Sequence, residues 1–242
     1  MTPFFDTHIH LSDFKNAAPT ELMSRLEKAG IQKCVCVSTR PDDWEKTAAL
    51  ARMFKFEIVP CFGLHPWYTA DAVSDWIRGL EDYLLEFETA LIGECGFDRL
   101  KNPDFESAQK IFEPQLELAY ALKRPLMLHM VKADEWLEHY FGRLPKNAVF
   151  HSFSGSIELA KKILKFGHMI SINKKFFNKK DAVQILKYMP IENILAETDA
   201  PFQSMPEDLG FVVQKIAEIK NLSREETTQK LYTNALEKLA VE

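Results

Sequence analysis

The feature of this chain that most limits its fold is a regular alternation of short apolar runs with longer amphipathic stretches. The short runs occupy residues 4–8, 33–39, 57–63, 90–95, 125–129, 148–152, 168–173 and 193–199. Runs of this length, rich in apolar and β-branched residues, predict buried strands. Between them, apolar residues recur at steps of three and four positions, which predicts helices.

Helix-ending signals support this division of the chain. Gly30 and Gly167 follow two amphipathic stretches where a C-cap glycine is expected, and Ser223 lies three residues before Glu226 as in a capping box. Eight strand–helix units with no linker between them predict one α/β domain over residues 1–242, a (β/α)8 TIM barrel. A doubly wound open sheet is the alternative, because eight strands alone do not prove closure.

Composition fits a globular protein and excludes some other classes. Hydrophobic residues make up 46% of the 242 residues and charged residues 27%. No apolar run reaches the roughly 18–20 residues that span a bilayer, and no leader pattern opens the chain. We therefore expect no membrane segment and a cytoplasmic location. The four cysteines lie in strand-like runs, which favours buried reduced thiols over disulfides or a thiolate metal site.

The charge is unevenly distributed. The formal net charge of −5 argues against a protein that coats nucleic acid through overall basicity. Residues 161–187 nevertheless contain eight lysines and a single acid, Asp181; the lysines are Lys161, Lys162, Lys165, Lys174, Lys175, Lys179, Lys180 and Lys187. This local excess surrounds the seventh predicted strand.

Seven potential metal ligands fall at the ends of the predicted strands. They are His8, His10, His65, Glu94, His129, His151 and Asp199. In a barrel the carboxyl ends of the strands converge on one face, where active sites are built. A single histidine or acid at a strand end is usually a packed or capping residue, but chance would scatter such residues over both ends. The shared position therefore indicates a functional site.

The chemistry of this set suits divalent metal ions. Imidazole and carboxylate together bind Zn or Mn, and a site richer in carboxylate or water suits Mg. The set exceeds what one tetrahedral ion needs, so we expect two ions, with Glu94 able to bridge them. Strand alternation places Asp6 with His8 and His10 on one face and Glu197 beside Asp199. We expect Asp6 and Glu197 to orient the ligands.

A combination of motifs links the chain to a known family. DTHIHL, GLHP, GECGFD, PLMLHM, FHSFSGS and ETDAP occur in this order within residues 4–202. Together they resemble the TatD family of metal-dependent deoxyribonucleases. The resemblance implies a barrel that hydrolyses DNA phosphodiesters with two divalent ions. It implies that His8 and His10 hold one ion with Asp199 at its open side, that Glu94 bridges to a second ion held by His129 and His151, and that His65 lies near the substrate phosphate.

The rim of the site departs from the family pattern. Val131 stands where the family usually has Arg, and NKKFFNKK at 173–180 replaces a Gly-containing loop. We expect Lys174 and Lys175 to contact substrate phosphates and Phe176 or Phe177 to offer a stacking face. A solvated lysine-rich turn with both phenylalanines packed inward is the alternative. The neighbouring pair Trp67–Tyr68 is expected to pack against a loop.

The predicted reaction is hydrolysis by a metal-activated water that Asp199 orients or deprotonates. Two other enzymatic interpretations use the same site: a phosphoesterase for a small metabolite, and an amidohydrolase that acts on C–N bonds. A non-catalytic barrel fits less well, because every metal position of the motif set is present.

Overall fold

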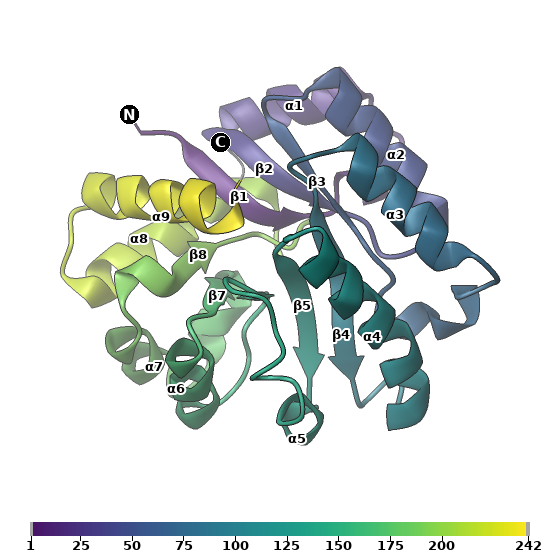
Figure 1. Cartoon of the computed structure of the whole chain (residues 1–242). Helices are drawn as coiled ribbons and strands as arrows, with labels where there is room; N and C mark the ends of the chain where they lie inside the picture. The colour runs from purple at the N-terminus through teal and green to yellow at the C-terminus, as the bar shows by residue number, and fades with distance from the viewer. Residues whose placement is uncertain (1, 241–242) are drawn as a thin grey trace.

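The computed structural model describes residues 2–240 as a ring of parallel strands surrounded by helices (Figure 1). The strands are β1 Phe4–Ile9, β2 Ile31–Val37, β3 Ile58–Phe62, β4 Leu91–Asp98, β5 Leu126–Val131, β6 Val149–Phe150, β7 Met169–Ile172 and β8 Ile194–Ala196. They pair in sequence order. A parallel bridge between Ile9 and Ala200 joins the first strand to the segment after the last. The predicted barrel is therefore confirmed, and the open doubly wound sheet is excluded.

Helices follow the strands and cover their outer faces (Figure 1). They are α1 Pro19–Lys28, α2 Pro41–Met53, α3 Trp76–Glu86, α4 Phe105–Ala121, α5 Asp134–Leu137, α6 Ile157–Lys165, α7 Ala182–Tyr188, α8 Leu209–Lys220 and α9 Arg224–Leu239, with 3₁₀ helices η1 Leu11–Asp13, η2 Pro66–Asp71, η3 Lys174–Asn178, η4 Ile191–Asn193 and η5 Pro206–Asp208. The predicted helix ends are present: Gly30 and Gly167 have φ of +80° and +77°, and Ser223 Oγ accepts a 3.1 Å hydrogen bond from the Glu226 backbone.

The apolar interior has two layers. One cluster takes at least one residue from each of the eight strands and ends against Ala235 and Leu239 of α9. The other packs the outer faces of the strands against the helices. Phe5 belongs to the first cluster and Ile9 to the second, so the strict alternation expected along β1 is wrong. The cause is a shift of the β1–β2 register between Asp6 and Ile9.

Among the strands that end earlier than the sequence predicted, β6 and β8 end next to candidate site residues. β6 stops at Phe150 rather than residue 152, and β8 stops at Ala196 rather than residue 199. Ser152 and Asp199 both adopt the left-handed region, with φ of +47° and +53°. These residues therefore interrupt the regular strand geometry, and their side chains lie on turns at the carboxyl end of the barrel, although the Asp199 N–H still donates to the His8 carbonyl.

None of the described helices is both long enough and apolar enough to cross a membrane.

Candidate metal centre

Five histidines and two acids converge at the carboxyl end of the barrel. His8 lies in β1, Glu94 in β4 and His129 in β5, whereas the other four come just after strands; these are His10, His65, His151 and Asp199. His8, His10, His65, Glu94, His151 and Asp199 are buried, and His129 is nearly so. All seven residues singled out from the sequence are thus brought to one place.

Glu94 lies between two groups of side chains, one at each carboxylate oxygen. Its Oε2 atom lies 3.5 Å from His8 Nε2 and 3.7 Å from His10 Nε2. The two imidazole nitrogens are 3.1 Å apart. Asp199 Oδ1 completes this group, 3.4 Å from His10 Nε2 and 4.0 Å from His8 Nε2. Four potential ligand atoms therefore face one small volume.

The second group gathers around Glu94 Oε1. His129 Nδ1 and His151 Nε2 each lie 2.7 Å from this oxygen. His65 Nε2 lies 3.3 Å from the same atom. Glu94 thus presents one carboxylate oxygen to each group, the position expected of a bridging carboxylate. The two groups also meet directly, because the rings of His8 and His151 stack with their centroids 3.9 Å apart.

In three of the histidines, the hydrogen-bond partner of one ring nitrogen determines whether the nitrogen that faces the centre carries a proton or a lone pair. His10 Nδ1 lies 3.1 Å from the Val37 carbonyl and His129 Nε2 lies 3.2 Å from Asp98 Oδ2, and both partners can only accept a hydrogen bond. His10 and His129 in their neutral forms therefore turn lone pairs toward the centre. His65 differs, because its Nδ1 accepts a hydrogen bond from the Trp67 backbone at 3.1 Å. Neutral His65 therefore carries its proton on Nε2, toward Glu94.

These lone pairs make the donor set suited to cations. The Nδ1 lone pair of neutral His129 and the Oε1 lone pairs of Glu94 both accept, yet the atoms lie 2.7 Å apart. Such a contact is stable only with a proton or a metal ion between the two groups. The described residues offer three trios of candidate ligand atoms within 4.8 Å of one another; these are His8–His10–Glu94, His65–Glu94–His129 and His8–His151–Glu197. Imidazole and carboxylate in this ratio fit Zn or Mn, and also Mg where water completes the shell.

Asp98 supports the centre and was not singled out from the sequence. Its Oδ2 accepts hydrogen bonds from His129 and, at 2.6 Å, from Trp67 Nε1. Glu94, Gly96 and Asp98 alternate along β4, so the strand period that grouped His8 with His10 could have identified it. Gly96, at φ +125°, allows this arrangement, since a Cβ there would meet the His129 carbonyl oxygen at 2.4 Å.

Asp6 and Glu197 hold the backbone around the centre. Asp6 accepts hydrogen bonds from the His8 backbone at 3.2 Å and from the Thr198 backbone and hydroxyl at 3.0 and 2.6 Å. Glu197 Oε1 accepts one from the Ser152 backbone at 2.6 Å and lies 3.6 Å from His151 Nδ1. Both carboxylates therefore connect the β1, β6 and β8 ends of the ligand set.

The pKa values of these groups follow from burial and mutual charge. Burial opposes ionisation of Glu94, but the charges of His151 and His65 and the contacts with His129 and His151 together outweigh it and hold the pKa of Glu94 well below its usual range. Burial, with a smaller contribution from the charge of Glu197, raises the pKa of Asp6 to about 7 against the effect of its hydrogen bonds. Burial lowers the pKa of His65 to about 4, which keeps this imidazole neutral. Burial opposes ionisation of Asp98 too, but hydrogen bonds from His129 and Trp67 bring its pKa to about 2.

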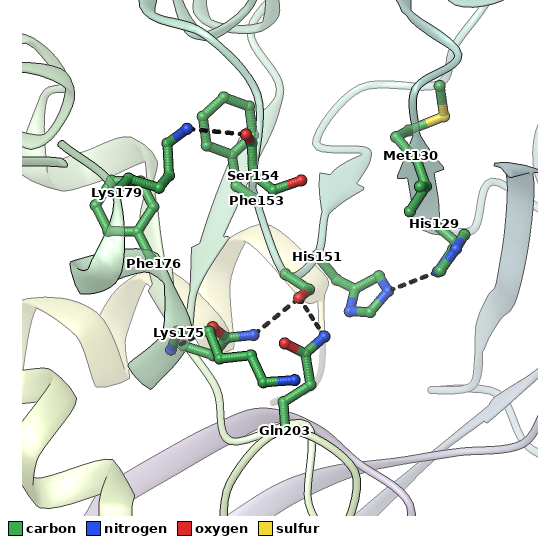
Figure 2. Close-up of a pocket in the computed structure, with 12 residues that line it drawn as sticks. His129, Met130, His151, Phe153, Ser154, Lys175, Phe176, Lys179 and Gln203 are labelled. Atoms are coloured by element: carbon green, nitrogen blue, oxygen red, sulfur yellow. Dashed lines mark hydrogen bonds between the residues drawn. The ribbon is translucent and has the colours of Figure 1, made fainter. Parts of the chain in front are cut away.

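At the rim of the centre, the structure separates the two lysines that the sequence predicted to act together. Lys174 Nζ donates to Asp208 Oδ1 at 2.8 Å, whereas Lys175 lines a cavity beside His129 and His151 (Figure 2). Phe176 is buried, so of the two phenylalanines predicted to offer a stacking face only the half-buried Phe177 remains a candidate. Trp67 is 51% exposed and its ring meets those of His65 and His129 edge-on, at centroid distances of 5.0 and 6.1 Å. It lies at the mouth of the centre rather than packed under a loop.

Comparisons with known proteins agree with this geometry. The sequence matches the family model described as TatD related DNase over residues 5–239. It is 27% identical to the metal-dependent hydrolase YjjV of Escherichia coli, over 96% of this chain and 95% of that protein. It is 28% identical to the 3'-5' ssDNA/RNA exonuclease TatD of Pantoea ananatis, over 85% of this chain and 82% of that protein. The crystal structure of Escherichia coli YjjV matches with a TM-score of 0.89 at 25% identity, covering 99% of this chain and 98% of that one.

A family model that spans nearly the whole chain and a full-length structural match together lead to one assignment. The chain belongs to the family of TatD-related DNases, which are metal-dependent hydrolases.

Proposed function

We propose that this protein hydrolyses phosphodiester bonds of DNA at a centre of two divalent metal ions. The observation that carries the proposal is the position of Glu94, with one carboxylate oxygen facing His8 and His10 and the other facing His129 and His151. The names of relatives support the substrate, since one is a deoxyribonuclease and another an exonuclease of single-stranded DNA and RNA.

The ligand assignment follows from which lone pairs face the centre. His8, His10, Asp199 and Glu94 Oε2 would hold one ion, and Glu94 Oε1, His129 and His151 the other. His65 is proposed as a substrate contact instead, because its protonated Nε2 is a donor. Mg, Mn and Zn all suit these donors, and availability selects among them.

Bound divalent ions would lower the pKa of water to about 7 and offset the charge that develops on a phosphate under attack. The protein side chains perform the remaining tasks. Asp199 keeps its carboxylate ionised: burial raises its pKa, but the hydrogen bond from His10 and the nearby charges of His8, His151 and His10 together lower it below its ordinary value. Its second oxygen can orient a water molecule and accept its proton. His65 Nε2, whose single proton faces Glu94 Oε1 in this structure, would turn to donate to a nonbridging phosphate oxygen. Asp6 and Glu197 keep the ligand-bearing turns in place.

The neighbourhood of the centre also suggests where DNA lies. We propose that its backbone runs over the loop at 173–180, where the lysine excess meets the mouth of the barrel. Lys174 would reach a phosphate only by leaving Asp208. A cytoplasmic location is part of the same proposal and agrees with four cysteines that are all buried and unpaired.

The experiment is a metal-dependence assay on several substrates. The purified protein is stripped with a chelator and restored with Mg, Mn or Zn, then given bis(p-nitrophenyl) phosphate, single-stranded DNA, duplex DNA and a cyclic amide. We expect phosphodiester cleavage that requires metal and is lost in Asp199→Asn, while the exposed-surface variant Glu88→Gln retains it. Turnover of the amide without any phosphodiester cleavage would establish the amidohydrolase alternative, and cleavage of the small diester alone would favour a metabolite phosphoesterase.

A further inference from the structure

Beside the metal centre lies a cavity of about 250 Å³ that the proposed reaction does not yet use. It extends from the rings of His129 and His151 toward Lys175, Phe176 and Lys179 (Figure 2). Its volume is below the roughly 300–1,000 Å³ of sites for drug-sized ligands, which suits a phosphate with its sugar. None of the described residues that line it is acidic, although the centre next to it is rich in carboxylates.

The lysines on this cavity differ in what they are bound to. Lys179 donates to the Ser154 carbonyl at 3.0 Å and lies 3.4 Å from Asp181, so its charge is already paired. Lys175 is exposed and makes its hydrogen bond through the backbone, to Asn173 Oδ1 at 3.0 Å. Its side chain extends along the cavity beside Gln203 (Figure 2). Lys175 is therefore the lysine of this cavity whose ammonium group remains available to an anion.

Asn173 positions the polar groups of the cavity together. Its Oδ1 accepts the Lys175 backbone N–H, which orients its Nδ2 to donate to Ser152 Oγ at 2.9 Å. Gln203 Nε2 donates to the same oxygen at 2.7 Å. A hydroxyl has two acceptor lone pairs and one proton, so Ser152 retains a proton to donate. The loops after β6, β7 and β8 thus bring a cation and a neutral donor to one wall.

The adjoining cavity is less suited to an anion. It has a volume of about 280 Å³ and shares Lys175 and Gln203 with the first. Its wall also includes Asp208, which is ion-paired with Lys174. An added phosphate there would meet a carboxylate and a neutralised lysine, whereas in the first cavity it meets uncommitted donors.

We infer that Lys175, with Ser152 and Gln203, forms a second phosphate subsite beside the metal centre, which binds a phosphate next to the one that is hydrolysed. The inference rests on the proposed phosphodiesterase function and specifies its substrate class: a nucleic-acid strand with at least two phosphates. The neighbouring phosphate can be an internal diester or a terminal monoester, because both present the same anionic oxygens to the ammonium group.

The test compares four substrates that each contain a phosphodiester to be cleaved and that differ in whether a second phosphate lies next to it. Bis(p-nitrophenyl) phosphate and dithymidine monophosphate have no second phosphate, trithymidine diphosphate has an internal one, and 5'-phosphorylated dithymidine monophosphate has a terminal one. In Lys175→Ala we expect kcat/KM to fall about tenfold, mainly through KM, on the two substrates with a second phosphate, the effect of one charged hydrogen bond. On the first two substrates we expect a change of less than about twofold.

Matched variants separate this role from a structural one. Lys175→Arg should restore most of the loss, and Lys187→Ala, an exposed lysine of the same basic segment outside both cavities, should behave as the unmodified protein. The salt dependence of KM on the longer substrates should weaken by about one unit of slope in Lys175→Ala. The thermal unfolding midpoint should not change, because Lys175 is exposed.

The outcomes distinguish the subsite from the function on which it rests. A loss confined to the internal or to the terminal phosphate supports the subsite and identifies the source of its ligand. Equal losses on all four substrates, or no loss on any, would overturn the subsite while leaving the phosphodiesterase in place. Failure of the unmodified protein to cleave any of the four would instead overturn the proposed function, and the subsite with it.

Discussion

The two ends of the barrel bury histidines in opposite surroundings. At the carboxyl end, burial alone would lower the pKa of His151, but Glu94 and Glu197 raise it well above its ordinary value. At the amino end of β7, His168 packs near the rings of Phe150 and Phe166, and burial lowers its pKa to about 4. Burial is similar at both places. The difference between His151 and His168 lies in the two carboxylates that face His151.

The largest expected effect comes from removing the carboxylate that the two halves of the centre share. Glu94→Gln keeps the shape of the side chain but loses its charge, so both groups of histidines lose their common partner. We expect turnover to fall by at least about 10³-fold, or ~4 kcal/mol, and bound metal to be lost. Elemental analysis after dialysis measures the bound metal, and single-turnover assays measure the rate of hydrolysis. Full activity after re-addition of metal would show that Glu94 is not the bridge.

The contrast between His151 and His168 can be tested by measuring the free energy of unfolding of the protein as a function of pH. Its folded pKa of about 4 lies below the ordinary 6.5, so the unfolded state takes up a proton first as the pH falls. The free energy of unfolding should therefore decrease between pH 6.5 and pH 4, by about 3 kcal/mol from this residue, and the decrease should be complete below pH 4. Above pH 6.5 both states are neutral and the residue contributes no slope.

The variant His168→Leu should remove that slope. Denaturant unfolding of both proteins at several pH values gives the difference between their free energies of unfolding. The contributions of the other titrating groups cancel in this difference. Parallel curves for the two proteins would show that burial does not shift the pKa of His168, and the contrast between the two ends of the barrel would then fail.

The variant Asp98→Asn tests whether the two halves of the metal centre can be disturbed separately. The amide cannot accept from His129 Nε2 with the strength of a carboxylate, so the ring loses the partner that directs its Nδ1 lone pair inward. We expect the affinity for one of the two Mn ions to fall by about 10–100-fold, as measured by calorimetric titration. Glu135→Gln, which removes an exposed acid from α5, serves as the control. Equal weakening of both ions would mean that the two halves are not separable.

The smallest expected effect comes from Trp67→Phe. The substitution keeps an aromatic ring beside His65 and His129 but removes the indole N–H that donates to Asp98 Oδ2. Asp98 retains its hydrogen bonds from the Leu100 and Lys101 backbone, so we expect a three- to fivefold decrease in kcat, about 1 kcal/mol. Tyr68→Phe is the matched control. A loss as large as that of Asp98→Asn would indicate that the indole has a direct role with substrate.

The sequence predicted the barrel and the composition of the centre because both depend on periodicity. Strand ends can be counted along the chain, and the carboxyl ends of parallel strands must meet, so His8, Glu94 and His129 could be placed together before any coordinates. Cap positions such as Ser223 depend on local chemistry and were equally accessible.

The features that the sequence could not predict depend on the directions of side chains and on the local backbone conformation of the folded chain. Lys174 and Lys175 are adjacent, yet one is paired with Asp208, 34 residues further along the chain, and the other lies on the cavity beside His151. β6 and β8 end before Ser152 and Asp199, whose positive φ the periodicity of apolar residues does not reveal. The tautomer of His65 follows from a backbone contact made only in the folded chain.

The most direct test of the metal centre is anomalous diffraction from a crystal of the protein soaked with Mn²⁺. We expect two anomalous peaks on either side of the Glu94 carboxylate, one bounded by His8, His10 and Asp199 and the other by His129 and His151. Peaks elsewhere, or a single peak that does not touch Glu94 in a crystal of active protein, would contradict this expectation.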